Sequence, residues 1–365
     1  MVALLFVVGT YLLRKVMTSQ PSTFHEKLCN HLSITTSREH RDVKNTPLVE
    51  SDTSQSCLSE EQFVSDVTVN FDDVIGVGKF GSVYRANGRL VDGSNVNLAF
   101  KVAHDFSESA RCHRNEVYIY EAQQTQHNIV TYYGTCIVKC KSGLLTEYCS
   151  QGNLRNFLEM NSIEIKLCVS MLYDVTSAIA YLHRINYDGD KPRIAHRDLC
   201  SSNFLVRGNH SLALSDFGSS MVIDDVTNDV TDARMENTYA EHLVAEGTPF
   251  YVAPEVLDLS INLRHQGEAL TQADVYSMSL VMWEVVTQCK EFNDTTPPHS
   301  LPYQHDVNNI HELIDHVVVR KNRPAFKFDT KKSDFVTSSR KLSPSVGIVT
   351  KTLACLRHAH VIVCL

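Results

Sequence analysis

The sequence contains no block of basic residues. Its 34 lysines and arginines are spread along 365 residues, they are outnumbered by 42 acidic residues, and the net charge is −8. A nucleic-acid-binding face requires basic side chains that cluster on one surface. The charge pattern therefore gives no support for nucleic acid as a partner.

Paired cysteine spacing is also missing. The 11 cysteines are scattered through segments that we predict to be core, and Cys136 and Cys140 have no matching second pair. Structural zinc sites and disulfide frameworks depend on such pairs. The pattern disfavours both and fits reduced thiols in the cytosol.

No apolar run at the amino terminus is long enough for a complete membrane span. Residues 2–13 are apolar and two basic residues, Arg14 and Lys15, follow directly, whereas a span needs about 20 residues. Basic residues after an apolar run favour the cytoplasm on that side. We interpret residues 1–15 as a partial transmembrane segment of a single-pass cell-membrane protein with a cytoplasmic domain. A marginal anchor that starts at Met1 is an alternative, and the lack of preceding basic residues disfavours a signal peptide.

The next segment is polar. Residues 16–69 are rich in Ser, Thr, Asp, Glu and Asn and show little apolar periodicity, which predicts a flexible juxtamembrane linker. We expect one two-lobed folded domain over residues 70–330 and a divergent tail over residues 331–365.

Five short motifs occur in a fixed order along the predicted domain. They are Gly76-Val77-Gly78-Lys79-Phe80-Gly81-Ser82-Val83, Ala99-Phe100-Lys101-Val102, His196-Arg197-Asp198-Leu199 with Asn203, Asp216-Phe217-Gly218, and Ala253-Pro254-Glu255. The ordered set resembles a eukaryotic-like protein kinase, in which such motifs supply a phosphate-covering loop, a phosphate-pairing lysine, a base and two metal ligands. The resemblance implies phosphoryl transfer from ATP. It also implies an α+β, bilobal protein kinase fold with a small antiparallel-sheet lobe that carries one helix, and a larger helical lobe.

The glycine motif predicts a β-hairpin. A dinucleotide site would place this loop between a strand and a helix, whereas residues 81–86 continue as an alternating strand. Glycine lacks a Cβ, so backbone N–H groups can approach phosphate oxygens. An ordinary turn is the alternative. The nucleotide-binding positions that we expect here are Gly76, Gly78, Gly81 and Val83.

Lys101 lies in a short apolar strand, where a fixed ammonium can face the inner phosphates of ATP. The alternative is a surface lysine on an edge strand. In kinases a glutamate on a helix orients this lysine. We expect Glu116 rather than Glu121 to be this partner, because Val117 and Tyr120 flank an inward-facing stripe around it.

Two carboxylates and an amide follow a predicted apolar helix over residues 167–183. By the resemblance, Asp198 accepts or orients the proton of the substrate hydroxyl, while Asn203 and Asp216 hold Mg²⁺, with Mn²⁺ as the alternative ion. Together with Lys101, Asp198 and Asn203 form the expected catalytic set.

The segment from 144 to 149 is similar to the strand that leads into the hinge between kinase lobes. Thr146 is then the small residue that guards the back of the nucleotide pocket, and backbone groups near Glu147 and Cys149 bind adenine. The alternative is an ordinary apolar strand.

The class of kinase follows from two positions near the base. Serine/threonine kinases usually place lysine where this chain has Cys200. Tyrosine kinases usually carry alanine and arginine in this loop, so the loop of this chain fits neither pattern. Thr248 matches the serine/threonine form, in which this threonine supports the catalytic aspartate. The sequence therefore favours Ser and Thr hydroxyls as acceptors. We expect His196 to be a packed scaffold residue and Arg197 to pair with the activation segment.

Three stretches resemble type II receptors of the transforming-growth-factor-β superfamily, in particular bone morphogenetic protein type II receptors and their invertebrate relatives. These stretches are residues 191–198, 254–264 and 320–326, and the likeness runs from about residue 70 to 326. Type I receptors carry a serine/glycine-rich run before the kinase domain, and residues 33–65 lack one, so type I is the minor alternative. The resemblance implies a receptor kinase that phosphorylates a type I partner, with an extracellular ligand bound only through an ectodomain that this sequence does not contain.

The carboxyl end departs from the family. After the segment ending at residue 326, kinases normally have further helices and an arginine that pairs with the glutamate found here as Glu255. Residues 331–365 show no such helices, so the C-terminal helices are expected to be missing, and nothing in the context of Arg340 or Arg357 marks either as a substitute. A buried glutamate without a partner is destabilising. The alternative function is therefore a catalytically inactive, truncated receptor that acts as a binding partner.

Overall fold

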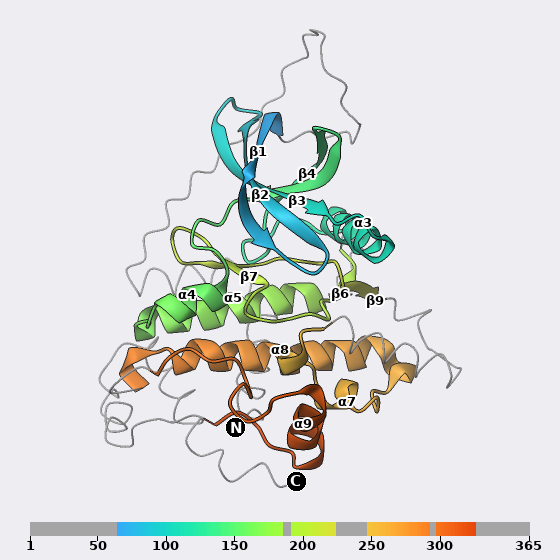
Figure 1. The fold of residues 1–365 in the computed structure, drawn as a ribbon, viewed down its shortest axis with the longest axis vertical. Helices are drawn as coiled ribbons and strands as arrows, with labels where there is room; N and C mark the ends of the chain where they lie inside the picture. Colours follow the sequence, from blue (N-terminus) through green and yellow to red (C-terminus); the bar gives the residue numbers. More distant parts are fainter. Residues whose placement is uncertain (1–63, 185–190, 224–246, 293–296, 326–365) are drawn as a thin grey trace.

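The computed structural model of the chain describes residues 64–184, 191–223, 247–292 and 297–325. These residues form an upper lobe built on one antiparallel sheet and a lower, mainly helical lobe (Figure 1). The predicted α+β, bilobal fold is confirmed. The expectations for the amino-terminal apolar segment and the divergent tail concern residues outside the described ranges, and so does the part of the activation segment (216–255) that covers 224–246.

The upper sheet has the strand order β1-β2-β3-β5-β4, with antiparallel neighbours. The strands are β1 (Val64–Val77), β2 (Gly81–Leu90), β3 (Asn95–Ala103), β4 (Tyr132–Val138) and β5 (Lys141–Glu147). β1 and β2 form the hairpin that the glycine motif predicts. Its tip ends opposite β3, which carries Lys101.

Strand β1 starts at Val64, six positions before the predicted start of the domain at residue 70, and so overlaps the end of the predicted linker over residues 16–69. Val64 is buried in the apolar cluster of the upper sheet, and Val67, Val69 and Phe71 pack against that cluster. The residues between them are polar and mostly exposed. This alternation belongs to a strand with one buried face, but the polar composition of the surrounding segment predicts a linker.

Helix α3 (Ser107–Glu121) lies beside the sheet and contacts β3 and β4. Its buried positions are Ser109, Cys112, Glu116, Ile119 and Tyr120, which follow a helical spacing of three and four. Glu116 is thus placed on the inward face by the same periodicity that buries its apolar neighbours.

The lower lobe is built around two long helices that pack against each other, α5 and α8. Its helices are α4 (Leu154–Met160), α5 (Ile165–His183), α7 (Pro254–Leu257), α8 (Gln266–Thr287) and α9 (Ile310–Ile314), with the short helical turns η1 (Pro249–Tyr251), η2 (Leu263–His265), η3 (Lys290–Phe292) and η4 (Asp315–Val319). Residues 274–286 of α8 are buried without interruption, because this helix lies in the centre of the lobe.

Among the described helices, α5 alone has the length and apolar composition that a membrane span requires. It is mostly buried within the protein and packs on α8. In this structure α5 is therefore a core helix.

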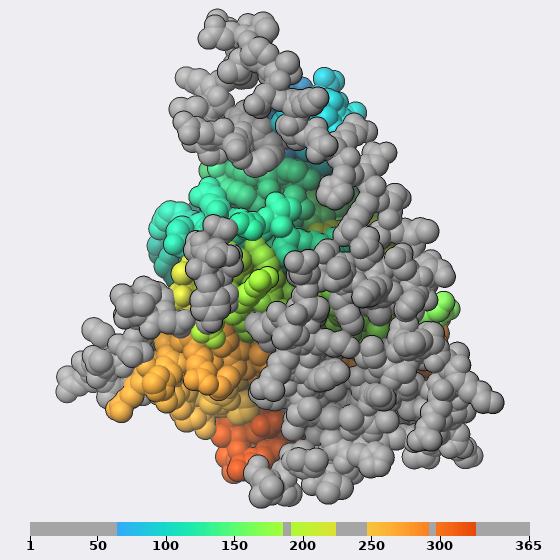
Figure 2. All heavy atoms as spheres, turned by 180° about the vertical axis from the view of Figure 1, so that it is seen from behind, coloured from blue at the N-terminus to red at the C-terminus, as the bar shows by residue number. Residues whose placement is uncertain are grey.

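Two small two-stranded sheets flank the loops that carry the predicted site residues. Strand β6 (Arg193–Ala195) pairs with β9 (Met221–Ile223), and β7 (Phe204–Val206) pairs with β8 (Leu212–Leu214). One apolar cluster runs from α3 and β5 through these strands into α5 and α8. Seen from behind, the described parts of the two lobes adjoin in the space-filling view (Figure 2). The loops that connect the small strands carry the predicted base and metal ligands.

Candidate active site

The tip of the β1–β2 hairpin contains the three predicted glycines. The Gly78 amide donates to the Gly81 carbonyl at 2.9 Å. A Cβ on Gly81 would lie 2.5 Å from a carbonyl oxygen of β3, so strand packing alone requires this glycine. At Gly76 and Gly78 the nearest atoms would be 3.7 and 3.8 Å away, so the protein itself leaves room for a side chain. Val83 pairs with Gly76 and with Lys101 in the sheet register. Close approach of a phosphate remains the predicted reason for the first two glycines.

Lys101 contacts two carboxylates at once. Its Nζ lies 2.7 Å from Oε2 of Glu116 and 2.9 Å from Oδ1 of Asp216. Burial alone would lower the pKa of Lys101, but the charges of Asp216 and Glu116 outweigh it and raise that pKa. The ammonium therefore stays charged, and the structure pairs it with Glu116, whereas Glu121 is exposed.

The two carboxylates that contact Lys101 respond differently to burial. Burial raises the pKa of Glu116 to about 7, in spite of the opposing attraction of Lys101. Burial also acts to raise the pKa of Asp216, but Lys101 outweighs it and holds that pKa below its ordinary value. The ionised carboxylate of Asp216 can then serve as an anionic metal ligand.

Asn115 anchors the loop that carries Asp216 to α3. Its Nδ2 donates to the carbonyl oxygens of Phe217 at 3.2 Å, Gly218 at 3.0 Å and Ser220 at 2.8 Å. Sequence reasoning missed this residue, because an asparagine beside Glu116 on a helix carries no signal of a partner about a hundred residues away.

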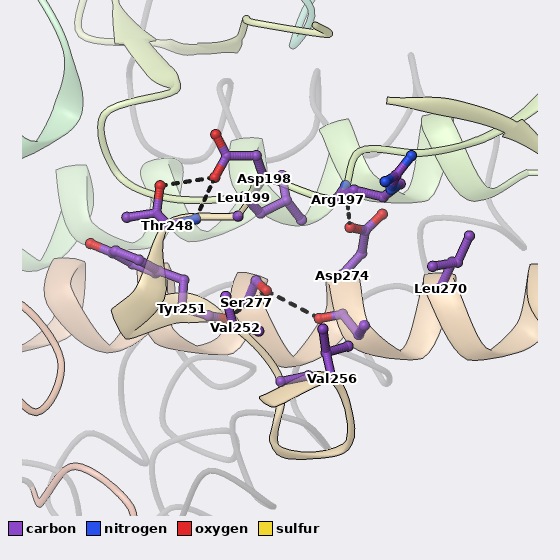
Figure 3. A pocket seen from close by; sticks show the side chains of 13 residues that line it. Arg197, Asp198, Leu199, Thr248, Tyr251, Val252, Val256, Leu270, Asp274 and Ser277 are labelled. Carbon is purple, nitrogen blue, oxygen red and sulfur yellow. Dashed lines mark hydrogen bonds between the residues drawn. The ribbon is translucent and has the colours of Figure 1, made fainter. Parts of the chain in front are cut away.

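The loop before the predicted base is held by a buried carboxylate on α8. Asp274 accepts hydrogen bonds from the amide of Arg197 at 2.9 Å (Figure 3), from the amide of His196 at 2.8 Å and from the ring of His183 at 2.9 Å. Burial acts to raise the pKa of Asp274, but His183 and the other donors outweigh it and lower that pKa. Sequence reasoning did not assign this role to Asp274.

His196 is fully buried, as expected of a scaffold residue. Its ring Nε2 donates to the Ser215 carbonyl at 3.1 Å, and its ring centroid lies 5.1 Å from that of Phe217. Arg197 has a φ of 71°, and Asp216 has a φ of 63°. The left-handed backbone at these two positions is strained for residues with a side chain. Of the activation segment, the predicted partner of Arg197, residues 224–246 lie outside the described ranges.

The Asp198 carboxylate is held by residues from two directions. Its Oδ1 accepts hydrogen bonds from the Thr248 amide at 2.9 Å and the Thr248 hydroxyl at 2.8 Å. Nδ2 of Asn203 donates to the Asp198 carbonyl at 2.8 Å and to Oδ2 at 3.2 Å. Burial raises the pKa of Asp198, and the nearby charge of Asp216 adds to that effect, although the Thr248 hydrogen bond opposes it. A carboxylate of raised pKa within reach of a substrate hydroxyl is a suitable proton acceptor.

The oxygen ligands at this site fit a magnesium ion that is shared with phosphates. Since Nδ2 of Asn203 donates to Asp198, its Oδ1 is the atom that can bind a metal, and the carboxylate of Asp216 supplies a second oxygen. Within the described ranges, no group of three or more His, Cys, Asp or Glu side chains could hold a metal ion by itself. Mg²⁺ in phosphoryl-transfer enzymes usually takes one or two protein oxygens and completes its shell with phosphates and water.

The predicted hinge lies at the end of β5. Thr146 is buried. The Glu147 carboxylate is held by Arg207 at 2.6 and 2.8 Å, while the Glu147 amide donates to the Thr131 carbonyl at 2.9 Å. The Cys149 carbonyl accepts from the Gly152 amide at 3.2 Å, and the adenine contacts near Glu147 and Cys149 stay predictions.

Cys200 is buried two positions after the predicted base. Burial raises the pKa of its thiol to about 12. The thiol is thus neutral at physiological pH and cannot replace the positive charge of the lysine that serine/threonine kinases usually place there.

A small cavity adjoins Asp198 on the side of the lower lobe (Figure 3). Residues from the loop of Asp198, from the segment that runs through Thr248 and η1 into α7, and from α8 line it. The Tyr251 and Val252 side chains lie below Thr248 in this view. The segment after Thr248 is therefore tied to the base on one side and to α8 on the other.

Glu255 follows this segment. Burial raises the pKa of its carboxyl, and the charge of Arg323 opposes that rise. Among the described residues, no basic side chain forms an ion pair with Glu255. The Arg323 guanidinium donates instead to the carbonyls of Val317 and Asn322, each at 2.7 Å. The predicted alternatives Arg340 and Arg357 lie outside the described ranges.

The family model of the protein kinase domain matches residues 69–346 of the chain. This match covers most of the chain and includes every predicted site residue.

Several curated proteins are similar over the same region. The chain is 31% identical over 266 residues to the TGF-beta receptor type-1 of Homo sapiens, which is 70% of this chain and 50% of that protein. It is 30% identical over 280 residues to the Anti-Muellerian hormone type-2 receptor of Oryctolagus cuniculus, covering 73% and 47%. It is 30% identical over 266 residues to the Activin receptor type-1B of Homo sapiens, covering 70% and 49%. The chain thus spans about half the length of the curated relatives it matches, and these carry both type-1 and type-2 names.

Proposed function

The chain belongs to the protein kinase domain family, and we propose that it is a receptor serine/threonine kinase that transfers the γ-phosphoryl group of ATP to a partner receptor. The observation that carries this proposal is the pair of contacts from Lys101 to Glu116 and Asp216. They join the sheet, α3 and the loop of Asp216 around one charged ammonium. A structural lysine has no need of this arrangement, whereas phosphate binding does.

In the proposed reaction, the β1–β2 hairpin covers the phosphates and Lys101 binds the inner ones. Asn203 and Asp216 hold Mg²⁺, which neutralises charge on the transferring group when it is bound. Asp198, oriented by Thr248 and Asn203, accepts or orients the proton of the attacking hydroxyl. Catalysis then consists of positioning and electrostatics by side chains that are already held in place.

The acceptor is proposed to be a Ser or Thr hydroxyl. The support is Thr248, whose two hydrogen bonds reach the same oxygen of Asp198. The names of the relatives add that proteins with a similar domain are receptors of the TGF-beta, activin and Anti-Muellerian hormone groups. By that likeness, and by its own resemblance to type II receptors, we assign a type I receptor of the same superfamily as the acceptor protein. The same likeness supports a single-pass cell-membrane protein with a cytoplasmic kinase domain.

A second candidate function is a non-catalytic binding partner. One observation favours it, namely the half-buried Glu255 without an ion-pair partner in the described residues. A weakened lower lobe could still bind ATP or another receptor without turnover.

The test is phosphate incorporation by the full chain with γ-labelled ATP and Mg²⁺. The acceptors are dephosphorylated casein and a kinase-inactive type I receptor. We expect wild type to label Ser and Thr, and Asp198→Asn to lose transfer by about 100-fold or more while it still binds a fluorescent ATP analogue. Asp72→Asn is the matched control, because Asp72 is exposed on β1.

Equal background labelling by wild type and Asp198→Asn, with ATP binding retained, would reject the enzymatic function and favour the non-catalytic binding partner. Labelling of casein but not of the type I receptor would keep the kinase and remove the proposed acceptor.

A further inference from the structure

The turn of the β1–β2 hairpin is attached to the segment that joins β3 to α3, and the roles assigned above do not account for this attachment. The hairpin turn comprises residues 78–80, and the joining segment comprises residues 104–106. The His104 amide donates to the Phe80 carbonyl at 3.1 Å. Nε2 of the His104 ring donates to the Gly78 carbonyl at 3.2 Å. Two carbonyls of the hairpin turn thus have donors in one residue.

A serine of α3 completes the attachment. The Ser109 hydroxyl donates to the Phe80 carbonyl, and its oxygen accepts from the His104 amide at 2.9 Å. Ser109 is completely buried. A buried hydroxyl is costly unless it is hydrogen-bonded, and these two bonds satisfy it. Ser109 therefore links the hairpin turn to α3 through a side chain that has no other partner among the described residues.

Ser109 lies on the same face of α3 as Glu116. Seven residues, which is about two helical turns, separate the two, and both belong to the buried positions of the helix. Glu116 pairs with Lys101. One face of α3 therefore holds both the lysine assigned to the inner phosphates and the turn assigned to cover them.

The attachment determines which way the amides of the hairpin turn face. In a trans peptide the C=O and N–H groups point in opposite directions, and no peptide bond of the described residues is cis. The carbonyls of Gly78 and Phe80 point towards the joining segment. The amides of the same two peptide groups, those of Lys79 and Gly81, therefore point away from it. Backbone amides of such turns are the groups that bind phosphate oxygens.

A charged contact at the same place contributes little. Nζ of Lys79 lies 3.7 Å from Oε1 of Glu108, and both side chains are about half exposed. Water and salt screen exposed ion pairs, so their contribution is small. The hydrogen bonds of His104 and Ser109 are the contacts that can fix the hairpin turn.

We propose that Ser109 and His104 are positioning residues that hold the hairpin turn so that its amides face the phosphates of a bound nucleotide. This inference rests on the proposed kinase function and deepens it, because it places a determinant of nucleotide affinity outside the five sequence motifs. The protein itself orders the turn through these bonds, so a nucleotide loses less free energy in ordering it.

The test measures the binding of adenosine and of AMP-PNP, a non-hydrolysable ATP analogue, to the full chain with Mg²⁺, by competition with a fluorescent ATP analogue. Ser109→Ala removes the hydroxyl, and His104→Leu removes the ring donor but keeps the amide. We expect each variant to raise the dissociation constant of AMP-PNP about fivefold, which corresponds to the loss of one hydrogen bond. The dissociation constant of adenosine stays within about twofold of wild type, because adenosine has no phosphate for the turn to bind.

Two neighbouring variants are matched controls. Ser107→Ala removes an exposed hydroxyl from the first turn of α3, and Glu108→Gln removes the exposed ion pair with Lys79. Both should bind AMP-PNP as wild type does. Unchanged affinity for AMP-PNP in Ser109→Ala and His104→Leu, or an equal loss of affinity for AMP-PNP and adenosine, would overturn the proposal.

Amide hydrogen exchange reports on the hairpin turn without nucleotide and without catalysis. In Ser109→Ala we expect faster exchange of residues 78–83 and of the His104 amide, which loses one of its two acceptors, and unchanged exchange in the lower lobe. If wild type transfers no phosphate, the kinase function fails, while the two affinities and the exchange rates still decide the role of Ser109. Identical exchange of the turn in wild type and Ser109→Ala refutes that role.

Discussion

The Thr248 hydroxyl donates a 2.8 Å hydrogen bond to Oδ1 of Asp198, across 50 positions of the chain. The Thr248 amide donates to the same oxygen at 2.9 Å. One residue therefore orients one oxygen of the predicted base, while Asn203 contacts the other. The segment before η1 is thus part of the site and not only a neighbour of it.

Removing this hydroxyl should slow transfer without weakening ATP binding. In Thr248→Val the hydrogen bond from the backbone amide to Asp198 remains, but the charge-assisted hydrogen bond from the side-chain hydroxyl is lost. This loss corresponds to about a tenfold fall in kcat. Steady-state kinetics with varied ATP checks this. Thr68→Val, at an exposed position of β1, serves as the control. An unchanged kcat would show that the amide alone is sufficient.

Asn115 should matter for the loop of Asp216, the proposed metal ligand. Asn115→Leu removes three hydrogen bonds to the carbonyls of residues 217, 218 and 220. Because these carbonyls hold the loop of Asp216 on α3, we expect a rise of about tenfold in the Mg²⁺ concentration needed for half-maximal ATP binding. Titration with a fluorescent ATP analogue measures it. A variant with wild-type Mg²⁺ dependence would limit Asn115 to a packing role.

Asp174 should produce a pH dependence of stability. Burial raises the pKa of its carboxyl from 3.8 to about 7, although the Leu212 amide donates to it at 2.9 Å. The folded state keeps this proton to higher pH than the unfolded chain, so the contribution is complete below pH 3.8 and is lost as pH rises through about 7. Within that window the free energy of unfolding falls by at most about 1.4 kcal/mol per pH unit from this group.

In Asp174→Asn this part of the pH dependence should disappear. Urea unfolding of wild type and variant at several pH values between 4.5 and 7.5 measures the difference. Asp72→Asn, exposed on β1, should run parallel to wild type. Parallel curves for Asp174→Asn as well would show that Asp174 does not titrate in this range.

The effect of Glu255 on thermal stability should show whether its carboxylate lacks an ion-pair partner in the lower lobe. Its carboxyl is half-buried, its pKa is raised by burial, and the described residues offer it no ion pair. Glu255→Gln should therefore leave the melting temperature unchanged or raise it by a few degrees, since it removes a desolvated charge. Differential scanning fluorimetry provides the measurement. A clear fall in melting temperature would reveal a basic partner in the part of the chain outside the described ranges.

The site residues that lie in short motifs could be predicted from the sequence. Lys101, Asp198, Asn203 and Asp216 have residue types and spacings that few other chemistries require. The choice of Glu116 over Glu121 also followed from sequence, because helical periodicity places only one of the two on the inward face. The start of β1 did not follow, because its apolar positions alternate with polar residues at the end of a segment whose overall composition is polar.

The contacts that hold these residues in place could not be predicted in the same way. Asn115 reaches a loop about a hundred positions away, Asp274 reaches back to His196 and Arg197, and Glu284 joins Ser201 to Tyr251. Each is an ordinary polar residue on a helix, and only the packing of α3 and α8 against the loops gives it a partner. The residue types of a short motif, and thus the chemistry that they can perform, are determined by neighbouring positions in the sequence. The orientation of a carboxylate depends instead on which distant donors the folded chain brings within about 3 Å of it.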